Sequence, residues 1–160
     1  VYSPWDILGF GKVTKFNGPA VVYDDTGTFE AISISDILLK KGLKVTMVGR
    51  GDSIGVRLPF PPVTAGAARE RLYSGNFDFI GGHHLLAIEE SRVEIGVMFT
   101  ERTRKIDAHT VVFVGHNSPN RELWVSLKGN GPKVHMIGDV RGHNSIMSAI
   151  HAGNSLGRSI

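Results

Sequence analysis

The chain has 160 residues, close to the ~150 residues of one typical domain. Hydrophobic residues make up 41% and charged residues 21%, which is typical of a globular protein and excludes a disordered chain. The absence of cysteine excludes a disulfide scaffold, thiolate catalysis, a cysteine-ligated zinc site and an iron–sulfur cluster within this chain.

Charge and hydropathy limit the partners. The net charge is only +3 and the charges are scattered, so we expect no nucleic-acid partner. No apolar run approaches the ~18 residues of a membrane-spanning helix and no signal peptide is visible, so we expect no membrane partner and a cytoplasmic protein. The chain begins with Val1 rather than methionine, which indicates a chain that is processed or cut from something longer.

The first half of the chain predicts a strand–helix–strand unit. Residues 1–18 form a lead-in arm in which Ser3–Leu8 can make a short helix capped by its first serine. Pro19–Asp24 is a short apolar strand, Thr28–Lys41 has helical spacing, and Lys44–Val48 is a second apolar strand. This order implies a right-handed crossover and a parallel sheet.

The second half adds further elements to this sheet. The patterns predict, in order, a helix at Thr64–Tyr73 with Thr64 as its cap, a strand at Phe77–Ile80, a hairpin of Leu85–Glu89 and Val93–Thr100, strands at Thr110–Val114 and Lys133–Ile137, and a helix at Ser145–Ile160. We expect an α/β fold with a Rossmann-like, mostly parallel sheet, covering helices and an inserted antiparallel meander. The expected strand order runs from Phe77 through Lys44 and Pro19 to Thr110. The strand at Lys133 and its helix either extend this sheet or belong to a missing second half.

The turn between the first strand and the first long helix resembles a degraded dinucleotide-binding turn. Where such a turn carries G-x-G-x-x-G, this chain has Asp25, Gly27 and Glu30, so only the middle glycine remains. A phosphate placed there would meet like charge. Asp24 and Asp25 can cap the helix and form the turn, or they can have replaced a lost pyrophosphate site. The two interpretations are compatible.

The second strand ends at Arg50, where NAD-binding units usually carry an acid that holds the ribose. A guanidinium suits a 2′-phosphate, so a bound nucleotide would more readily be NADP(H). The alternative is a solvated arginine. The seven histidines lack metal-ligand spacing, and no catalytic constellation is supported, so we predict neither a metal site nor a catalytic residue in this chain.

Three later motifs, in this order and spacing, resemble a known family. They are Gly115 followed by Pro119–Asn120, the Ile137–Asp139 turn, and the small-residue helix from Ser145. Together they resemble the C-terminal dinucleotide-binding region of old-yellow-enzyme-like NADH:flavin oxidoreductases, of the trimethylamine and histamine dehydrogenase and 2,4-dienoyl-CoA reductase type. The Ser3–Leu8 segment looks like the family's entry into the inserted domain.

The resemblance implies a cofactor role for several residues. Asp139 would lie on the flavin side of an FAD, with Gly138 beside it as a candidate, and Ser145 and Ile146 would present a helix N-terminus to the cofactor. The alternative is that Gly138 and Asp139 only form a turn from a strand to a loop. Gly115, in the first of these motifs, is a further candidate for contact with a bound cofactor. FMN and the iron–sulfur cluster are expected only in a part of the enzyme that this chain does not contain.

The resemblance also implies a division of the chain and a function. Residues 19–116 would be the NAD(P)-binding-like domain, and residues 117–160 would return to the FAD half. The expected function is a domain of a flavin-dependent oxidoreductase with a degraded nicotinamide site and no catalytic centre of its own. FAD or ADP and NAD(P)H would bind weakly or not at all, and the partner would be the remainder of a larger flavoprotein or a second copy. The alternative is a structural or interaction module that keeps the fold and binds no nucleotide.

Overall fold

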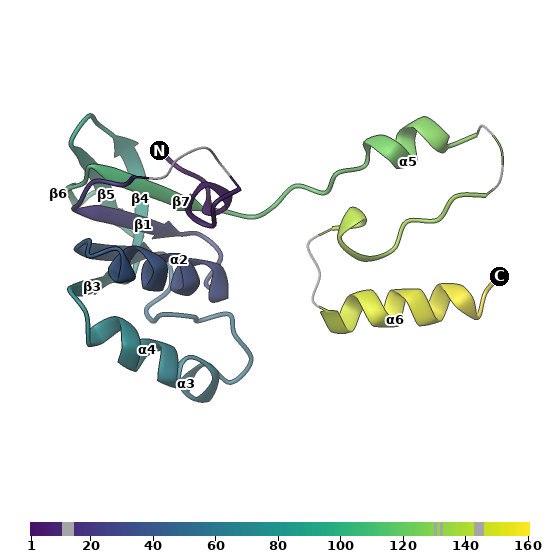
Figure 1. Ribbon diagram of the computed structural model, residues 1–160, viewed down its shortest axis with the longest axis horizontal. Coiled ribbons are helices and arrows are strands. Elements are labelled where there is room, and N and C mark those ends of the chain that lie inside the picture. The colour runs from purple at the N-terminus through teal and green to yellow at the C-terminus, as the bar shows by residue number, and fades with distance from the viewer. Residues whose placement is uncertain (11–14, 130, 132, 143–145) are drawn as a thin grey trace. The chain divides into compact units, whose positions relative to one another are not determined.

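The computed structural model describes residues 1–10, 15–129, 131, 133–142 and 146–160. The chain divides into two compact units, Val1–Gly115 and His116–Ile160, and each is described by itself (Figure 1). Within the described residues, no helix is both long enough and apolar enough to cross a bilayer.

A four-stranded parallel sheet forms the centre of the first unit. Its order is β3 (Phe77–Ile80), β2 (Val45–Gly49), β1 (Ala20–Asp24) and β7 (Thr110–Val114), which confirms the order expected from the sequence. Every residue of β1 and β2 is buried, because both strands are covered on both faces.

Helices cover one face of this sheet. Helix α2 (Phe29–Lys40) and helix α4 (Gly66–Tyr73) pack alternate residues of the strands into one apolar cluster, with Ile34 and Leu72 among its fully buried side chains. Ahead of α4, Pro61–Thr64 forms the short helix α3, where the sequence predicted a break in the chain. Thr64 therefore does not cap α4, whose N-cap position is Ala65.

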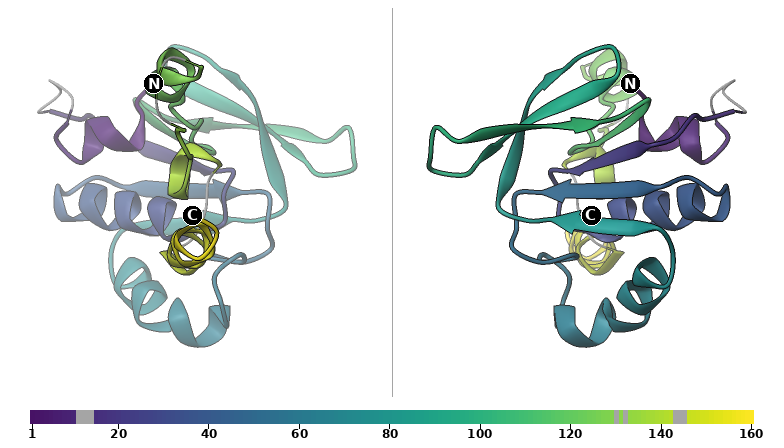
Figure 2. Two further views of the ribbon diagram at one scale, coloured as in Figure 1. Left: turned by 90° about the vertical axis from the view of Figure 1, so that its right-hand side faces the viewer. Right: turned by 90° about the vertical axis from the view of Figure 1, so that its left-hand side faces the viewer.

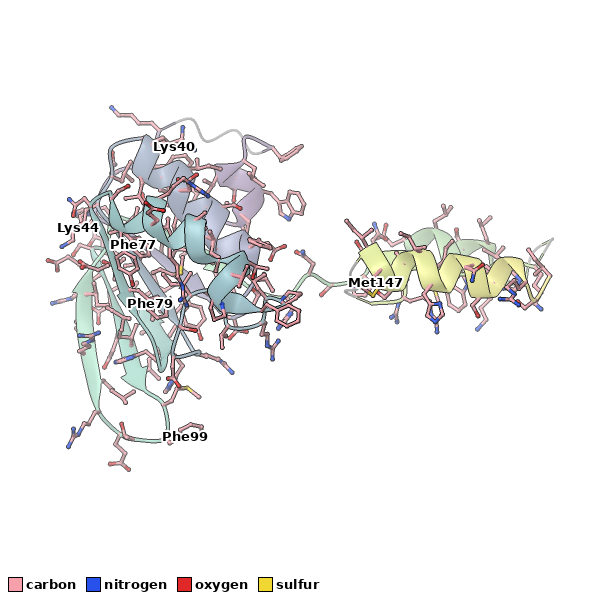
Figure 3. The ribbon with its side chains drawn as sticks, turned by 90° about the horizontal axis from the view of Figure 1, so that it is seen from below. Lys40, Lys44, Phe77, Phe79, Phe99 and Met147 are labelled. Atoms are coloured by element: carbon pink, nitrogen blue, oxygen red, sulfur yellow. The ribbon has the colours of Figure 1, made fainter. Side chains whose placement is uncertain are left out.

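An antiparallel sheet covers the opposite face (Figure 2). Its order is β4 (His83–Ile88), β5 (Arg92–Val97) and β6 (Thr103–Asp107), so the inserted meander is confirmed. The strand β6 was not predicted, because its exposed polar residues show no alternation. The expected strand through Thr100 ends instead at Val97, and Phe99 lies 97% exposed at the outer end of the β5–β6 hairpin (Figure 3).

The N-terminal segment packs onto the same unit. Helix α1 (Pro4–Ile7) has the expected Ser3 cap, in which the Ser3 hydroxyl and the Asp6 carboxylate each bond the other residue's backbone N–H. Ile7 is buried in the helical cluster, and Tyr2 pairs with β7 beside Val112.

The second unit contains helix α5 (Glu122–Leu127), a 3₁₀ turn η1 (Gly138–Val140) and helix α6 (Ile146–Gly157). The helix at α6 was expected, but the strand expected at Lys133–Ile137 was wrong, since this segment has no strand structure. A strand needs a neighbouring strand to take its backbone hydrogen bonds, and the described residues of this unit offer none.

Ser35 provides a test of the core. Its side chain is fully buried on α2, and its hydroxyl has no hydrogen-bond partner among the described residues. Because an unpaired buried hydroxyl carries a desolvation cost, Ser35→Ala is expected to raise the free energy of unfolding by about 1 kcal/mol or more. Urea denaturation measures the change.

Ser33→Ala is the matched control, since Ser33 is exposed on the same helix. It gains only helix propensity, about 0.5 kcal/mol. An equal effect of the two substitutions would show that the Ser35 hydroxyl carries no such cost.

Candidate nucleotide-binding site

The carboxyl-terminal edge of the parallel sheet gathers the first group of predicted site residues. Asp25 and Gly27 follow β1, and Arg50 follows β2, which pairs with β1 up to Gly49. The backbone N–H of Asp25 donates to the carbonyl of Val114, the last residue of β7, at 2.9 Å. In an open α/β sheet this edge is where ligands bind.

The turn after β1 is organised by Asp24, one of the two acidic residues to which the sequence assigned turn formation. Asp24 is 6% exposed, and its Oδ1 accepts the backbone N–H of Thr26 at 3.0 Å and that of Gly27 at 2.8 Å. The same oxygen accepts the Thr26 hydroxyl at 3.0 Å. Two backbone amides of the turn therefore bond a carboxylate of the protein itself, as in an Asx turn.

Asp25 points to the neighbouring strand end. Its Oδ1 lies 2.7 Å from Nε of Arg50, and the hydroxyl of Tyr23 donates to it at 3.4 Å. Nε of Arg50 also donates to the Tyr23 hydroxyl at 3.2 Å. Arg50 is thus ion-paired as well as partly solvated, and a 2′-phosphate would have to compete with Asp25 for it.

Gly27 adopts a φ of +66°, which an L side chain rarely takes. A Cβ added there would lie 2.9 Å from Cγ1 of Val56 and 3.3 Å from Cγ of Arg57. The backbone N–H of Arg57 donates to the carbonyl of Gly27 at 3.0 Å. The close approach that this glycine permits is therefore made by the chain's own loop.

The other predicted residues divide between the two units. Glu30 is half-buried in the first turn of α2, near the same edge. Gly115 directly follows β7, where a Cβ would lie 2.6 Å from the Phe113 ring, so the absence of a side chain there makes room for a neighbouring aromatic.

The remaining site residues lie in the second unit. Gly138 and Asp139 form the 3₁₀ turn that contacts α6, and a Cβ on Gly138 would lie 4.0 Å from Cβ of Ala149. Ile146 begins α6 and is 81% exposed, while Ser145 lies outside the described residues. The structure thus groups Asp25, Gly27 and Arg50 in one unit, and Gly138 and Asp139 in the other.

The turn between β1 and α2, residues 25–28, is here named the glycine turn, and its residues do not fit a dinucleotide phosphate. Two turn amides already bond Asp24, and Val56 lies against the place that a Cβ on Gly27 would take. Within the described residues, no group of three or more His, Asp and Glu side chains is arranged to hold a metal ion. Sequence reasoning missed Val56 and Arg57, since nothing in their local pattern signals a contact with a turn some thirty residues earlier.

Comparison with known proteins gives a structural match only. No protein-family model and no curated protein matches the chain. The 6-hydroxypseudooxynicotine amine oxidase from Pseudomonas geniculata N1 matches with 26% identity and a TM-score of 0.84 over 97% of this chain. Histamine dehydrogenase from Rhizobium sp. 4-9 matches with 22% identity and a TM-score of 0.85 over 99% of this chain. A 2-naphthoyl-CoA reductase matches with 25% identity and a TM-score of 0.77 over 98% of this chain.

All three proteins are old-yellow-enzyme-like flavoproteins. The resemblance expected from the sequence is confirmed. The chain covers only 24%, 26% and 23% of these three proteins, so it corresponds to about a quarter of such an enzyme.

Asp24 gives the site a measurable pH dependence. Burial raises the pKa of the Asp24 carboxyl above its ordinary value of 3.8, although the hydrogen bonds from Gly27 and Thr26 oppose the shift. Because the folded-state pKa is the higher one, the contribution of Asp24 to stability is fully present below about pH 3.8 and is lost as the pH rises through the raised value.

Asp24→Asn removes this titration and keeps an oxygen that can accept the same N–H groups. We therefore expect the free energy of unfolding of the wild type, minus that of Asp24→Asn, to fall as the pH rises from about 3 to about 7. Urea denaturation of both proteins across this range measures it. A difference that does not change with pH would contradict the raised pKa.

Proposed function

We propose that this chain is the NAD(P)-type domain and returning segment of a larger flavin-dependent oxidoreductase. The flavin chemistry is carried outside this chain, which has no catalytic centre of its own. Three flavoprotein neighbours that match nearly the whole chain support this proposal, as does its span of about a quarter of each.

Within that enzyme the nicotinamide-nucleotide site is degraded. The observation that carries this part of the proposal is the Asp24 carboxylate, which accepts two amides of the turn where a pyrophosphate would bind. A phosphate ~4 Å from a carboxylate would meet a repulsion of about 1 kcal/mol per charge pair in water and about 4 kcal/mol near a protein surface. The domain would then serve the enzyme as a structural part.

Titration with nucleotides tests this proposal. We expect neither NADH nor NADPH to bind with a dissociation constant below about 1 mM, equivalent to about −4 kcal/mol, because the amides and the space are already used. Isothermal calorimetry and thermal shift measure it. Micromolar binding of either nucleotide would contradict the degraded site.

Titration with ADP and FAD distinguishes a flavoprotein domain from a structural or interaction module. Sub-millimolar binding of either would support a flavoprotein domain that keeps part of its cofactor site. Silence with all four nucleotides would favour a structural or interaction module that keeps the Rossmann-like fold alone.

The second unit carries the contact with the rest of the enzyme in this proposal. Its helices and its 3₁₀ turn contain no buried residue, although their apolar side chains are large. The exposed fractions are 71% for Leu123, 81% for Ile146, 80% for Met147 (labelled in Figure 3) and 68% for Ile150. A surface of this kind is typical of an interface, and we assign it to the remainder of the larger flavoprotein, with a homodimer as the alternative.

Removing the second unit tests this assignment. The buried hydrophobic side chains of the described residues all lie between Ile7 and Val114. A chain ending at Gly115 should therefore unfold cooperatively at nearly the melting temperature of the full chain. It should also lose the binding of a hydrophobic dye, and any self-association, that the full chain shows.

Light scattering measures the molecular mass in solution, and the fluorescence of the bound dye reports the exposed apolar surface. A full chain that is monomeric and binds no dye would contradict the assignment. A full chain that forms a stable dimer and binds no dye would favour the homodimer instead.

A further inference from the structure

The loop Gly51–Leu58, here named the strap, leads from β2 toward α3 (Figure 1). It contacts the glycine turn. Its contact with that turn has two parts. The backbone N–H of Arg57 donates to the carbonyl of Gly27, and Cγ1 of Val56 lies 2.9 Å from the place of a Cβ on Gly27. The strap therefore covers the one glycine of the fingerprint that this chain has kept.

The strap is fixed to the body of the first unit. Ile54 is 2% exposed and Leu58 7% exposed, and both pack in the helical cluster. Nη2 of Arg69 on α4 donates to the carbonyl of Ile54 at 2.9 Å. The backbone N–H of Gly82 donates to the carbonyl of Gly51 at 3.2 Å, so the strap is held at its start and along its length.

Val56 itself is not part of the core. It is 45% exposed, and its Cγ1 also lies 2.6 Å from the place of a Cβ on Gly51. The side chain thus lies where a Cβ on either of these two glycines would clash with it. Burial alone does not explain such a placement, because nearly half of the side chain remains in water.

We propose that the strap is an internal occupant of the glycine turn, and that Val56 excludes a dinucleotide by shape. In a dinucleotide-binding turn the middle glycine lets the backbone approach the pyrophosphate. Here Val56 and Arg57 occupy the space next to this glycine, while Asp24 accepts hydrogen bonds from the backbone amides of the turn. The inference rests on the proposed degraded site and adds that removing the acidic charges is not sufficient to restore binding.

Three variants separate shape from charge. The first is Asp24→Asn with Asp25→Asn, which removes the two charges next to Gly27 and keeps the strap. The second adds Val56→Ala, which removes the Cγ atoms that contact the glycine. The third adds Val63→Ala to the first variant instead, as a matched control, since Val63 is an exposed valine on α3.

The measurement is calorimetric titration of each variant with NADH and NADPH. We expect the variant that contains Val56→Ala to bind at least tenfold more tightly than the charge variant and the Val63 control. If the three variants bind with equal affinity, or if none of them binds, the proposed role of the strap is overturned, while the proposal of a degraded site still stands. Tight binding by the wild type overturns the degraded site itself.

Thermal unfolding provides a second test that needs no ligand. Gly27→Ala is expected to lower the melting temperature, both because of its positive φ and because its Cβ meets Val56. In the Val56→Ala background the second cause is removed, so the loss should be smaller, whereas the Val63→Ala background should leave it unchanged. An equal loss in all backgrounds overturns the contact on which the proposal depends.

Discussion

The turn that joins β1 to α2 depends on one carboxylate. Asp24 ends a fully buried strand, and its Oδ1 accepts N–H groups from Thr26 and Gly27 together with the Thr26 hydroxyl. Because this oxygen is buried, each of those bonds satisfies a polar group that would otherwise be costly. They also hold Gly27 at its positive φ, where the strap can lie against it.

The neighbouring charges follow from that arrangement. With Asp24 directed into the turn, Asp25 is free to reach Arg50 at the end of β2, and Tyr23 joins both. Half-exposed ion pairs contribute little to stability. The Asp25–Arg50 pair therefore matters mainly because it engages the guanidinium that a nucleotide phosphate would otherwise bind. The sheet edge at which open α/β sheets bind ligands is here bonded within the protein itself.

The sequence was a good guide where burial on both faces determines the pattern. The apolar runs in β1, β2 and β7 predicted a parallel sheet with the correct strand order. The spacing in α2 predicted a helix at Thr28–Lys41, where the structure has Phe29–Lys40. The strand β6 was missed because its side chains are mostly exposed. The segment at Lys133–Ile137 shows the converse, since apolar composition does not make a strand without a neighbour to bond.

The candidate site was predicted in place but not in detail. Turn position identified Asp25 and Gly27 at the sheet edge, and helix and strand order identified Arg50. The choice between Asp24 and Asp25 depends on which side chain points into the turn, and two adjacent acids give no local signal of it. The contact of Val56 with Gly27 joins positions that only the folded chain brings together.

The two units differ in the degree to which each can stabilise itself. The first has two apolar clusters on opposite faces of one sheet, which is the layered arrangement of an independent domain. The second has helices whose apolar side chains are exposed and a segment that has no strand partner among the residues that the structure describes. The proposed place of this chain in a larger enzyme accounts for this asymmetry, because in that proposal the first unit completes its own core while the second packs against the rest of the enzyme.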